Sequence, residues 1–448
     1  MSHSESTRRG VSISRPGSIS ASKVRRRYPE FDALRGTAIL LVVTLHAALA
    51  YTRFDIPRLL WGVRDPSAHL VFDLFAWWSM SVSVALFFTI SGYFAAEVES
   101  TRGPVAFLRS RARRVVLPML AVAPVLLPLC FFAWSGGWLA TGRATPHEFW
   151  RMRFLDPAIM NDLYGPAHLW FLEYLIPMLA AYGFWRKDQI DRETRKARIR
   201  ADFAIKENKI QAARRGRAKK VRVDTATKST TSASTAAPSW LLSPWAPLAL
   251  VVPTVLLLVL SRVVSGVDAA LDRHNSFFPG PIRLIYYSGF FAFGVGLHRV
   301  RSKMEVLAGR GWWLLLAAIP CFAVRAWLLP LDWKEPLGEV GALLLTIAGA
   351  LTTWLSLFGL LGVYRRHFSH PSRTIRTLAE ASFWIYLTHL PIVGLIQMDL
   401  YNRPLPTMVK FALTWSLTLA IGLGSYLVLI RGSKLGRFLN GGQARAWV

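Results

Sequence analysis

The sequence predicts an all-α, polytopic integral membrane protein with about ten transmembrane helices. Of its 448 residues, 53% are hydrophobic. Charged residues make up 18%, below the roughly 25% that is usual in soluble domains. Apolar stretches of about 20 residues recur, and each is long enough to cross the ~30 Å hydrocarbon core of a bilayer as a helix. The lipid bilayer is therefore the first predicted partner.

The predicted spans are separated by connections of unequal charge. Arg25, Arg26 and Arg27 precede the first span and place the N-terminus inside. Lys and Arg then gather in the second, fourth, sixth and eighth connections and in both tails, so we expect both termini in the cytoplasm. In chain order the spans are 36–53, 72–97, 115–134, 167–185, 241–263, 281–298, 312–330, 339–363, 377–398 and 407–430.

Three segments lie outside these spans. Residues 1–27 are rich in Ser and Arg and lack a signal-peptide core, which predicts a disordered, basic cytoplasmic tail. The transmembrane domain, 28–430, is interrupted at 186–240 by a basic stretch followed by a Ser/Thr/Ala-rich one. We interpret this loop as a flexible cytoplasmic insertion, its first part able to form a short helix, rather than a dedicated binding module. Residues 431–448 form a second cytoplasmic tail.

Composition excludes several classes of protein. A net charge of +28 suggests nucleic acid in a soluble protein, but here the basic residues lie between spans, so no nucleic-acid partner is expected. Cys130 and Cys321 lie in apolar segments, which argues against a disulfide framework or a metal site. The sequence has no P-loop, GxSxG or HExxH motif.

One polar stripe runs along the first span. Arg35 and His46 are 11 residues apart, which places them on one helix face with about 16 Å between them along the axis. Asp32 falls on the same face at the cytoplasmic edge. An ionisable side chain inside a membrane is costly and normally faces a bundle interior or a wet cavity. The alternatives are a hydrogen bond from His46 to a neighbouring helix and an Asp32–Arg35 pair that only anchors the membrane edge.

The ninth span repeats this pattern. Ser382, Tyr386 and His389 are spaced at i, i+4 and i+7 and share one face. His389 and His46 lie at similar depth on spans that run in the same direction, which predicts one shared cavity. Pro391 follows directly and is expected to free a backbone carbonyl in its helix.

Further candidates lie in the outer half of the membrane. His168, Trp170 and Glu173 belong to the fourth span. Trp170 is either an interface aromatic, the commoner use, or a stacking platform for a sugar ring. Arg325 lies in the seventh span and needs an acidic or carbonyl partner.

A basic segment follows the second span. Arg109, Arg113 and Arg114 either anchor the topology, which is the commoner reason for such a cluster, or bind a phosphate-bearing donor at the cytoplasmic mouth.

Several stretches together resemble membrane-bound acyltransferase family 3, which carries an Arg and a His separated by ten residues. The first of them holds Arg35 and His46 at that spacing. The resemblance covers about residues 25–430 and is greatest to the glucan biosynthesis protein C branch, the periplasmic glucan succinyltransferases. The stretches are FDALRGTAILLVVTLH, FFTISGYFA, FLRSRARRVVLP, GPAHLWFLEYLIP, FFAFGVGLHR and RTLAEASFWIYLTHLPIV.

The resemblance implies a multi-pass enzyme of a bacterial inner membrane that moves an acyl group from cytoplasmic acyl-CoA to a hydroxyl of an extracytoplasmic carbohydrate. Acyl-CoA is then a donor substrate, and no tightly bound cofactor is expected. With the shared helix face, it suggests His46 as the general base, with a transient acyl-imidazole as an open alternative. Arg35 would bind phosphate or polarise the thioester carbonyl, and Asp32 would orient Arg35.

Two other functions stay open, as does the choice of substrate. A transporter or flippase for a glycan or acyl precursor would also carry charges inside the membrane, although the sequence shows no repeat of the kind many transporters have. A lipid-binding scaffold leaves the two histidines without a use. A succinyl group calls for a cation such as Arg325 or Arg283, whereas an acetyl group needs only a small apolar slot.

Overall fold

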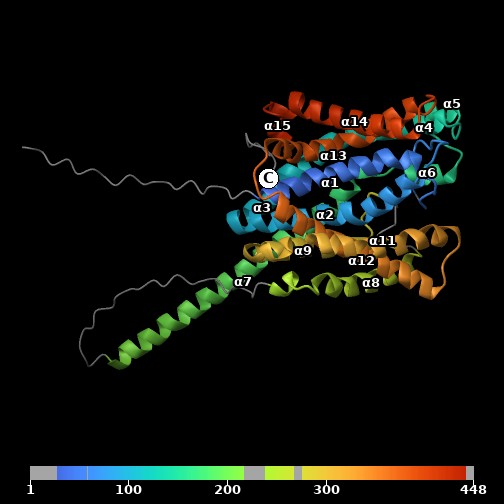
Figure 1. Cartoon of the computed structure of the whole chain (residues 1–448). Coiled ribbons are helices and arrows are strands. Elements are labelled where there is room, and N and C mark those ends of the chain that lie inside the picture. Colours follow the sequence, from blue (N-terminus) through green and yellow to red (C-terminus); the bar gives the residue numbers. More distant parts are fainter. Residues whose placement is uncertain (1–27, 58, 216–237, 267–274, 440–448) are drawn as a thin grey trace, which may run out of the picture.

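The computed structural model describes residues 28–57, 59–215, 238–266 and 275–439. Within these ranges the elements are helices and no strand is present, so the all-α prediction is confirmed. Figure 1 shows the long helices lying side by side in one bundle, with α7 extending beyond it at one end. The tail 1–27, and residues 216–237 of the predicted loop, lie outside the described ranges.

The long helices carry the architecture, and short elements join them. The long helices are α1 (Pro29–Ala48), α2 (Leu70–Arg102), α3 (Pro104–Arg111), α4 (Leu117–Ala140), α7 (Trp170–Arg215), α8 (Ala246–Ser265), α9 (Pro281–Arg299), α11 (Gly311–Lys334), α12 (Glu339–His367), α13 (Arg373–Leu400) and α14 (Thr407–Ser425). The short α-helices are α5 (Pro146–Arg151), α6 (Pro157–Leu163), α10 (Glu305–Ala308) and α15 (Lys434–Leu439).

Eight helical segments in the described ranges are long and apolar enough to cross a membrane. They correspond to eight of the ten predicted spans and confirm a multi-pass membrane protein. The remaining two predicted spans, 167–185 and 281–298, coincide with α7 and α9, which are helical and belong to the bundle but are not among the eight. The count of ten therefore stays a prediction.

Two helices exceed their predicted spans for a physical reason. The first begins at Pro29 rather than at residue 36, because proline fits the first turn of a helix and the polar residues after it are compatible with helix. The helix α7 runs unbroken for 46 residues, since charged helix formers continue it after the apolar stretch ends. The first part of the predicted loop 186–240 is therefore a long helix rather than a short one.

The bundle has an inner and an outer layer. In the most apolar stretches of α1, α2, α12 and α13, between 61% and 78% of the residues are buried inside the protein. The corresponding share for α4, α8 and α11 is 22%, as expected for helices whose other faces contact lipid. The inner layer is thus where polar side chains are shielded from lipid.

The close crossing of α2 and α9 depends on two glycines. A Cβ placed on Gly92 would lie 2.0 Å from the carbonyl oxygen of Phe291. One placed on Gly294 would lie 2.0 Å from the carbonyl oxygen of Thr89. Small residues allow helix backbones to approach this closely inside a membrane.

The two ends of the bundle differ in charge. The start of α1, the helices α3 and α15, and the projecting part of α7 lie together at one end, here called the basic end (Figure 1). There Arg365 forms ion pairs with Glu30 and Glu305. At the opposite end Lys410 forms a buried ion pair with Asp65, with 2.6 Å between Nζ and Oδ2. Which end faces the cytoplasm stays a prediction.

Candidate active site

Two histidines from α1 and α13 meet inside the bundle. Nε2 of His389 lies 3.1 Å from Nδ1 of His46. Nδ1 of His389 lies 2.8 Å from the carbonyl oxygen of Tyr386 and 3.1 Å from that of Ile385. A carbonyl only accepts, so in the neutral ring Nδ1 of His389 carries the hydrogen and Nε2 accepts one from His46. This leaves Nε2 of His46 as the basic nitrogen of the pair.

A third histidine completes the group. The ring of His168 lies 5.2 Å from that of His389, measured between centroids. Its Nε2 donates to the carbonyl oxygen of Leu387 at 2.9 Å. This carbonyl has no amide partner one turn later, because residue 391 is Pro391 and has no N–H. The carbonyl that the sequence predicted to be freed thus fixes the third histidine.

The backbone around His168 is held in an unusual conformation. Ala167, the residue before it, has a φ of 47°, a value that costs energy for any residue with a Cβ. The N–H of Ala167 donates to Oδ1 of Asn275 at 3.0 Å. From the other side, the hydroxyl of Tyr386 donates to the carbonyl oxygen of His168 at 2.6 Å. Two contacts from distant parts of the chain therefore fix this histidine.

Two residues that the sequence did not single out hold His46. The indole of Trp61 stacks on the His46 ring, with centroids 5.6 Å apart and planes 14° apart. Its Nε1 donates to Oε1 of Gln397 at 2.8 Å. The amide nitrogen of Gln397 in turn donates to the carbonyl oxygens of His46 and Ala47, both at 3.1 Å. In the sequence, the only sign of Gln397 was one uncharged polar residue in an apolar run, eight positions after His389.

The three histidines line a cavity, here called the histidine chamber. Its wall also includes Ser83 of α2 and Trp170 of α7. The rest of the lining is apolar apart from the hydroxyl of Tyr386, and His46 itself is partly buried.

A second cavity, here called the arginine chamber, adjoins it toward the basic end. It contains about 890 Å³ of empty space, part of it open to solvent. Three arginines line it: Arg35, Arg111 and Arg114. The two chambers share Phe87, Phe171 and Tyr386 in their walls, so these three rings, here called the aromatic constriction, lie at the boundary between them.

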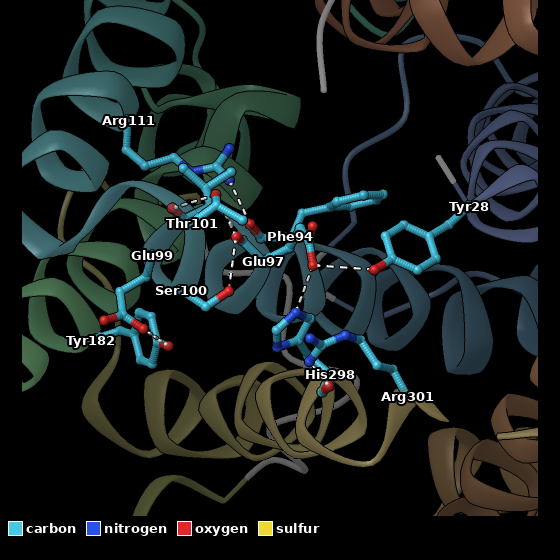
Figure 2. Close-up of polar contacts among 11 residues, drawn as sticks. Tyr28, Phe94, Glu97, Glu99, Ser100, Thr101, Arg111, Tyr182, His298 and Arg301 are labelled. Atoms are coloured by element: carbon cyan, nitrogen blue, oxygen red, sulfur yellow. Dashed lines mark hydrogen bonds and ion pairs between the residues drawn. The ribbon is translucent and has the colours of Figure 1, made fainter. Parts of the chain in front are cut away.

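Two of the arginines, Arg111 and Arg35, are placed by contacts with α2 and α13. The guanidinium of Arg111 donates to the carbonyl oxygen of Phe94 at 3.0 Å, as Figure 2 shows. The guanidinium of Arg35 lies 6.0 Å from the centroid of the Phe94 ring and 3.5 Å from Oγ of Ser382. The carboxylates of Asp32 and Glu380 add attractive charge around Arg35. Among the described residues that line the chamber, three are arginines and none is acidic.

The end of α2 is tied to its neighbours by two glutamates (Figure 2). Oε2 of Glu97 accepts hydrogen bonds from Nε2 of His298 at 2.7 Å and from the hydroxyl of Tyr28 at 3.3 Å. Oε2 of Glu99 accepts one from the hydroxyl of Tyr182 at 3.2 Å. These bonds join α2 to the start of α1, to α7 and to α9, and so fix one wall of the arginine chamber.

The predicted arginine cluster divides between the chamber and the surface. Arg114 is buried and lines the arginine chamber. Arg109 and Arg113 are exposed and line neither chamber. Arg111, which the sequence pattern did not single out, lines the arginine chamber. The helix α3 and the helical turn after it direct only some of the basic side chains inward.

The remaining predicted residues lie at different distances from the histidines. Trp170 lines the histidine chamber. The guanidinium carbon of Arg283 lies 5.6 Å from the centroid of the Trp170 ring. The carboxylate oxygens of Glu173 are shielded from solvent and have no hydrogen-bond partner among the described residues, although Arg283 attracts their charge. Arg325 is buried on α11 against Gly349 of α12 and lines neither chamber.

These features define a class of protein: a polytopic membrane protein with a histidine site inside its bundle, next to a cavity lined by three arginines. A family model for an acyltransferase domain matches residues 28–430. The chain therefore belongs to acyltransferase family 3 and is a membrane acyltransferase. No curated protein and no solved structure matched it. Among the residues that the structure describes, no group of three or more His, Cys, Asp or Glu side chains is placed to hold a metal ion.

Proposed function

We propose that the protein transfers an acyl group from acyl-CoA, bound at the basic end, to a hydroxyl of a carbohydrate that enters from the opposite end. The excess of Lys and Arg at the basic end favours a cytoplasmic location for that end. The observation that supports the proposal most is the His46–His389 hydrogen bond of 3.1 Å in the wall of the histidine chamber. The neighbouring chamber is lined by three arginines. The arginine chamber suits an anionic donor, and the histidine chamber suits proton transfer.

The donor would lie with its phosphates in the arginine chamber. Guanidinium groups bind phosphate through several N–H donors, and Arg35, Arg111 and Arg114 line this space together. The thioester end would extend past the aromatic constriction toward His46, which lies about 16 Å from Arg35 along the helix axis. Aromatic walls of this kind fit the narrow, uncharged arm that carries the thioester better than they fit the charged nucleotide.

The chemistry would start at the basic nitrogen of His46. Nε2 takes the proton of the acceptor hydroxyl as its oxygen attacks the thioester carbonyl carbon. The tetrahedral intermediate then collapses, the C–S bond breaks, and the imidazolium returns the proton to the departing thiolate. The products are an ester and free CoA, and no further reactant is needed. His389 orients His46 and sets which of its nitrogens is basic.

The identity of the acyl group and of the acceptor belongs to the same proposal. A periplasmic glucan of a bacterium and an inner-membrane location follow from the resemblance to the glucan biosynthesis protein C branch. For a succinyl group, Arg283 is better placed than Arg325, because Arg283 lies over Trp170 in the wall of the histidine chamber. An acetyl group needs no such cation.

The test uses the purified protein in detergent with succinyl-CoA or acetyl-CoA labelled in the acyl group and a soluble glucan. The wild type should move the label to the glucan, whereas His46→Ala and Arg35→Ala should not. If both variants keep wild-type transfer, the assignment of the site is wrong. If the wild type leaves all the label on CoA, the protein does not catalyse the proposed reaction, and transport of a glycan or acyl precursor becomes the better hypothesis. Label trapped on His46 would favour the acyl-imidazole route over direct transfer.

A further inference from the structure

Two buried polar atoms in the histidine chamber have no hydrogen-bond partner among the described residues: Nδ1 of His168 and Oγ of Ser83. Both residues line the chamber. Their exposed fractions are 5% and 0%, so bulk solvent does not satisfy them. Leaving a polar group buried without a partner costs about 1–3 kcal/mol. Native proteins keep few such groups, and each calls for an explanation such as a bound water, an ion or a role in catalysis.

The two atoms have complementary hydrogen-bonding roles. His168 already donates through Nε2 to Leu387, so its Nδ1 offers a lone pair and can only accept. The hydroxyl of Ser83 can donate its hydrogen. One acceptor and one donor in the same wall match a ligand hydroxyl, which donates one hydrogen bond and accepts another.

The packing of α2 against α7 brings this pair together. The rings of Phe87 and Phe171 lie 5.6 Å apart, measured between centroids. Ser83 precedes Phe87 by one helical turn, and His168 precedes Phe171 by about one turn. Both α2 and α7 run toward the basic end (Figure 1), and His168 lies in the short 3-10 turn Ala167–Leu169 that leads directly into α7. Ser83 and His168 therefore lie on the same side of the Phe87–Phe171 contact, away from the basic end.

We propose that Ser83 and His168 bind a second, non-reacting hydroxyl of the acceptor, next to the hydroxyl that gives its proton to His46. The inference rests on the proposed function and narrows its substrate class. The acceptor must carry two neighbouring hydroxyls, as sugars and other polyols do. A simple alcohol fills only the reacting position and leaves both buried atoms without partners.

The backbone around His168 supports a binding role over simple packing. Ala167 has a positive φ, and Asn275 and Tyr386 fix the peptide groups on either side of it. Strain of this kind persists where the surrounding structure enforces it, and it is concentrated in functional sites. A histidine that served only to join two helices needs its Nε2 contact alone.

The reacting groups of the donor, its thioester carbonyl and the thiolate that leaves, do not satisfy both atoms. The carbonyl oxygen of a thioester accepts from Ser83 but offers no hydrogen to His168. A thiolate likewise only accepts. A hydroxyl satisfies both at once, and this sets the acceptor side apart from the donor side.

The test measures kcat/KM with labelled succinyl-CoA or acetyl-CoA, whichever the wild type transfers faster, for methyl β-D-glucopyranoside and its 2-, 3-, 4- and 6-deoxy analogues, with the acylated position assigned by NMR. For the wild type, removal of the hydroxyl next to the acylated one should lower kcat/KM about 10- to 100-fold. Ser83→Ala should lower kcat/KM for the parent glucoside by a similar factor. For that deoxy analogue, the same variant should lower kcat/KM by less than about threefold relative to the wild type. His168→Leu, which removes the Nδ1 acceptor, should likewise bring kcat/KM for the parent glucoside close to that for the deoxy analogue.

The control is Ser79→Ala, one turn earlier on α2. Its hydroxyl donates to the carbonyl oxygen of Leu41 at 3.2 Å, and it does not line the chamber. The ratio between parent and deoxy glucoside should stay as in the wild type. Equal losses for Ser83→Ala on every acceptor, or a wild type indifferent to every neighbouring deoxy position, would overturn the inference while leaving acyl transfer intact. A wild type that acylates no glucoside while releasing no CoA would instead overturn the proposed function, and with it this inference.

Discussion

Replacing His389 separates its role as a positioning residue from any direct contact with substrate. In His389→Leu the side chain keeps similar bulk, but Nδ1 of His46 loses the acceptor that lies 3.1 Å away. The donor would be left buried without a partner, or the ring would change tautomer and present an N–H where the base is required. The first cost is about 1–3 kcal/mol. Since about 1.4 kcal/mol corresponds to a factor of ten, kcat should fall roughly 10- to 100-fold with little change in KM for acyl-CoA.

The matched variant is His389→Gln, whose side-chain oxygen can accept the same hydrogen bond. It should keep kcat within about fivefold of the wild type. Both variants are assayed in detergent by release of free CoA and by label on the acceptor, together with their thermal midpoints. Wild-type kcat in His389→Leu would refute the reasoning. So would an equal loss in both variants at equal thermal stability, because the acceptor oxygen would then make no difference.

Three further predictions follow from packing and charge. Arg111→Gln should raise KM for acyl-CoA about tenfold or more in a steady-state assay, whereas exposed Arg109→Gln should change it less than about twofold. Gly294→Ala should lower the thermal midpoint by forcing α2 and α9 apart, at a cost of roughly 1–3 kcal/mol, whereas Gly289→Ala, with open space beside it, should not. Lys410→Met should destabilise the fold by about 3–5 kcal/mol, measured by thermal unfolding, because it leaves a buried carboxylate unpaired. An unchanged KM for acyl-CoA in Arg111→Gln would contradict the first prediction. An unchanged thermal midpoint in Gly294→Ala or in Lys410→Met would contradict the second or the third.

From the sequence alone, spatial proximity could be predicted only for residues on regular helix faces. The 11-residue step from Arg35 to His46, and the matching stripe through Ser382 and His389, depend only on helical periodicity and on depth in the membrane. The structure places His389 against His46 and Ser382 beside Arg35. Local rules were sufficient here, since each stripe lies on one unbroken helix.

Other features required knowledge of which helices are neighbours. Ser83 gave no signal because a serine in an apolar helix usually bonds its own backbone, and its role depends on the packing of α2 against α7. Arg325 looked like a site residue by its depth, yet it is turned toward α12. Trp61 lies in a connection between spans, where periodicity gives no information. In each case the deciding fact is a tertiary contact between distant segments.

The aromatic constriction between the two chambers also bears on the membrane itself. An opening that admits a donor from one side and an acceptor from the other is a potential leak for protons and ions. Phe87, Phe171 and Tyr386 interrupt it with apolar surface, the Phe171 ring lying 5.6 Å from one neighbour and 5.8 Å from the other. A narrow apolar constriction resists filling by a continuous column of water. In the proposed acyl transfer, the same three rings would border the path of the acyl chain and would keep a continuous column of water out of it.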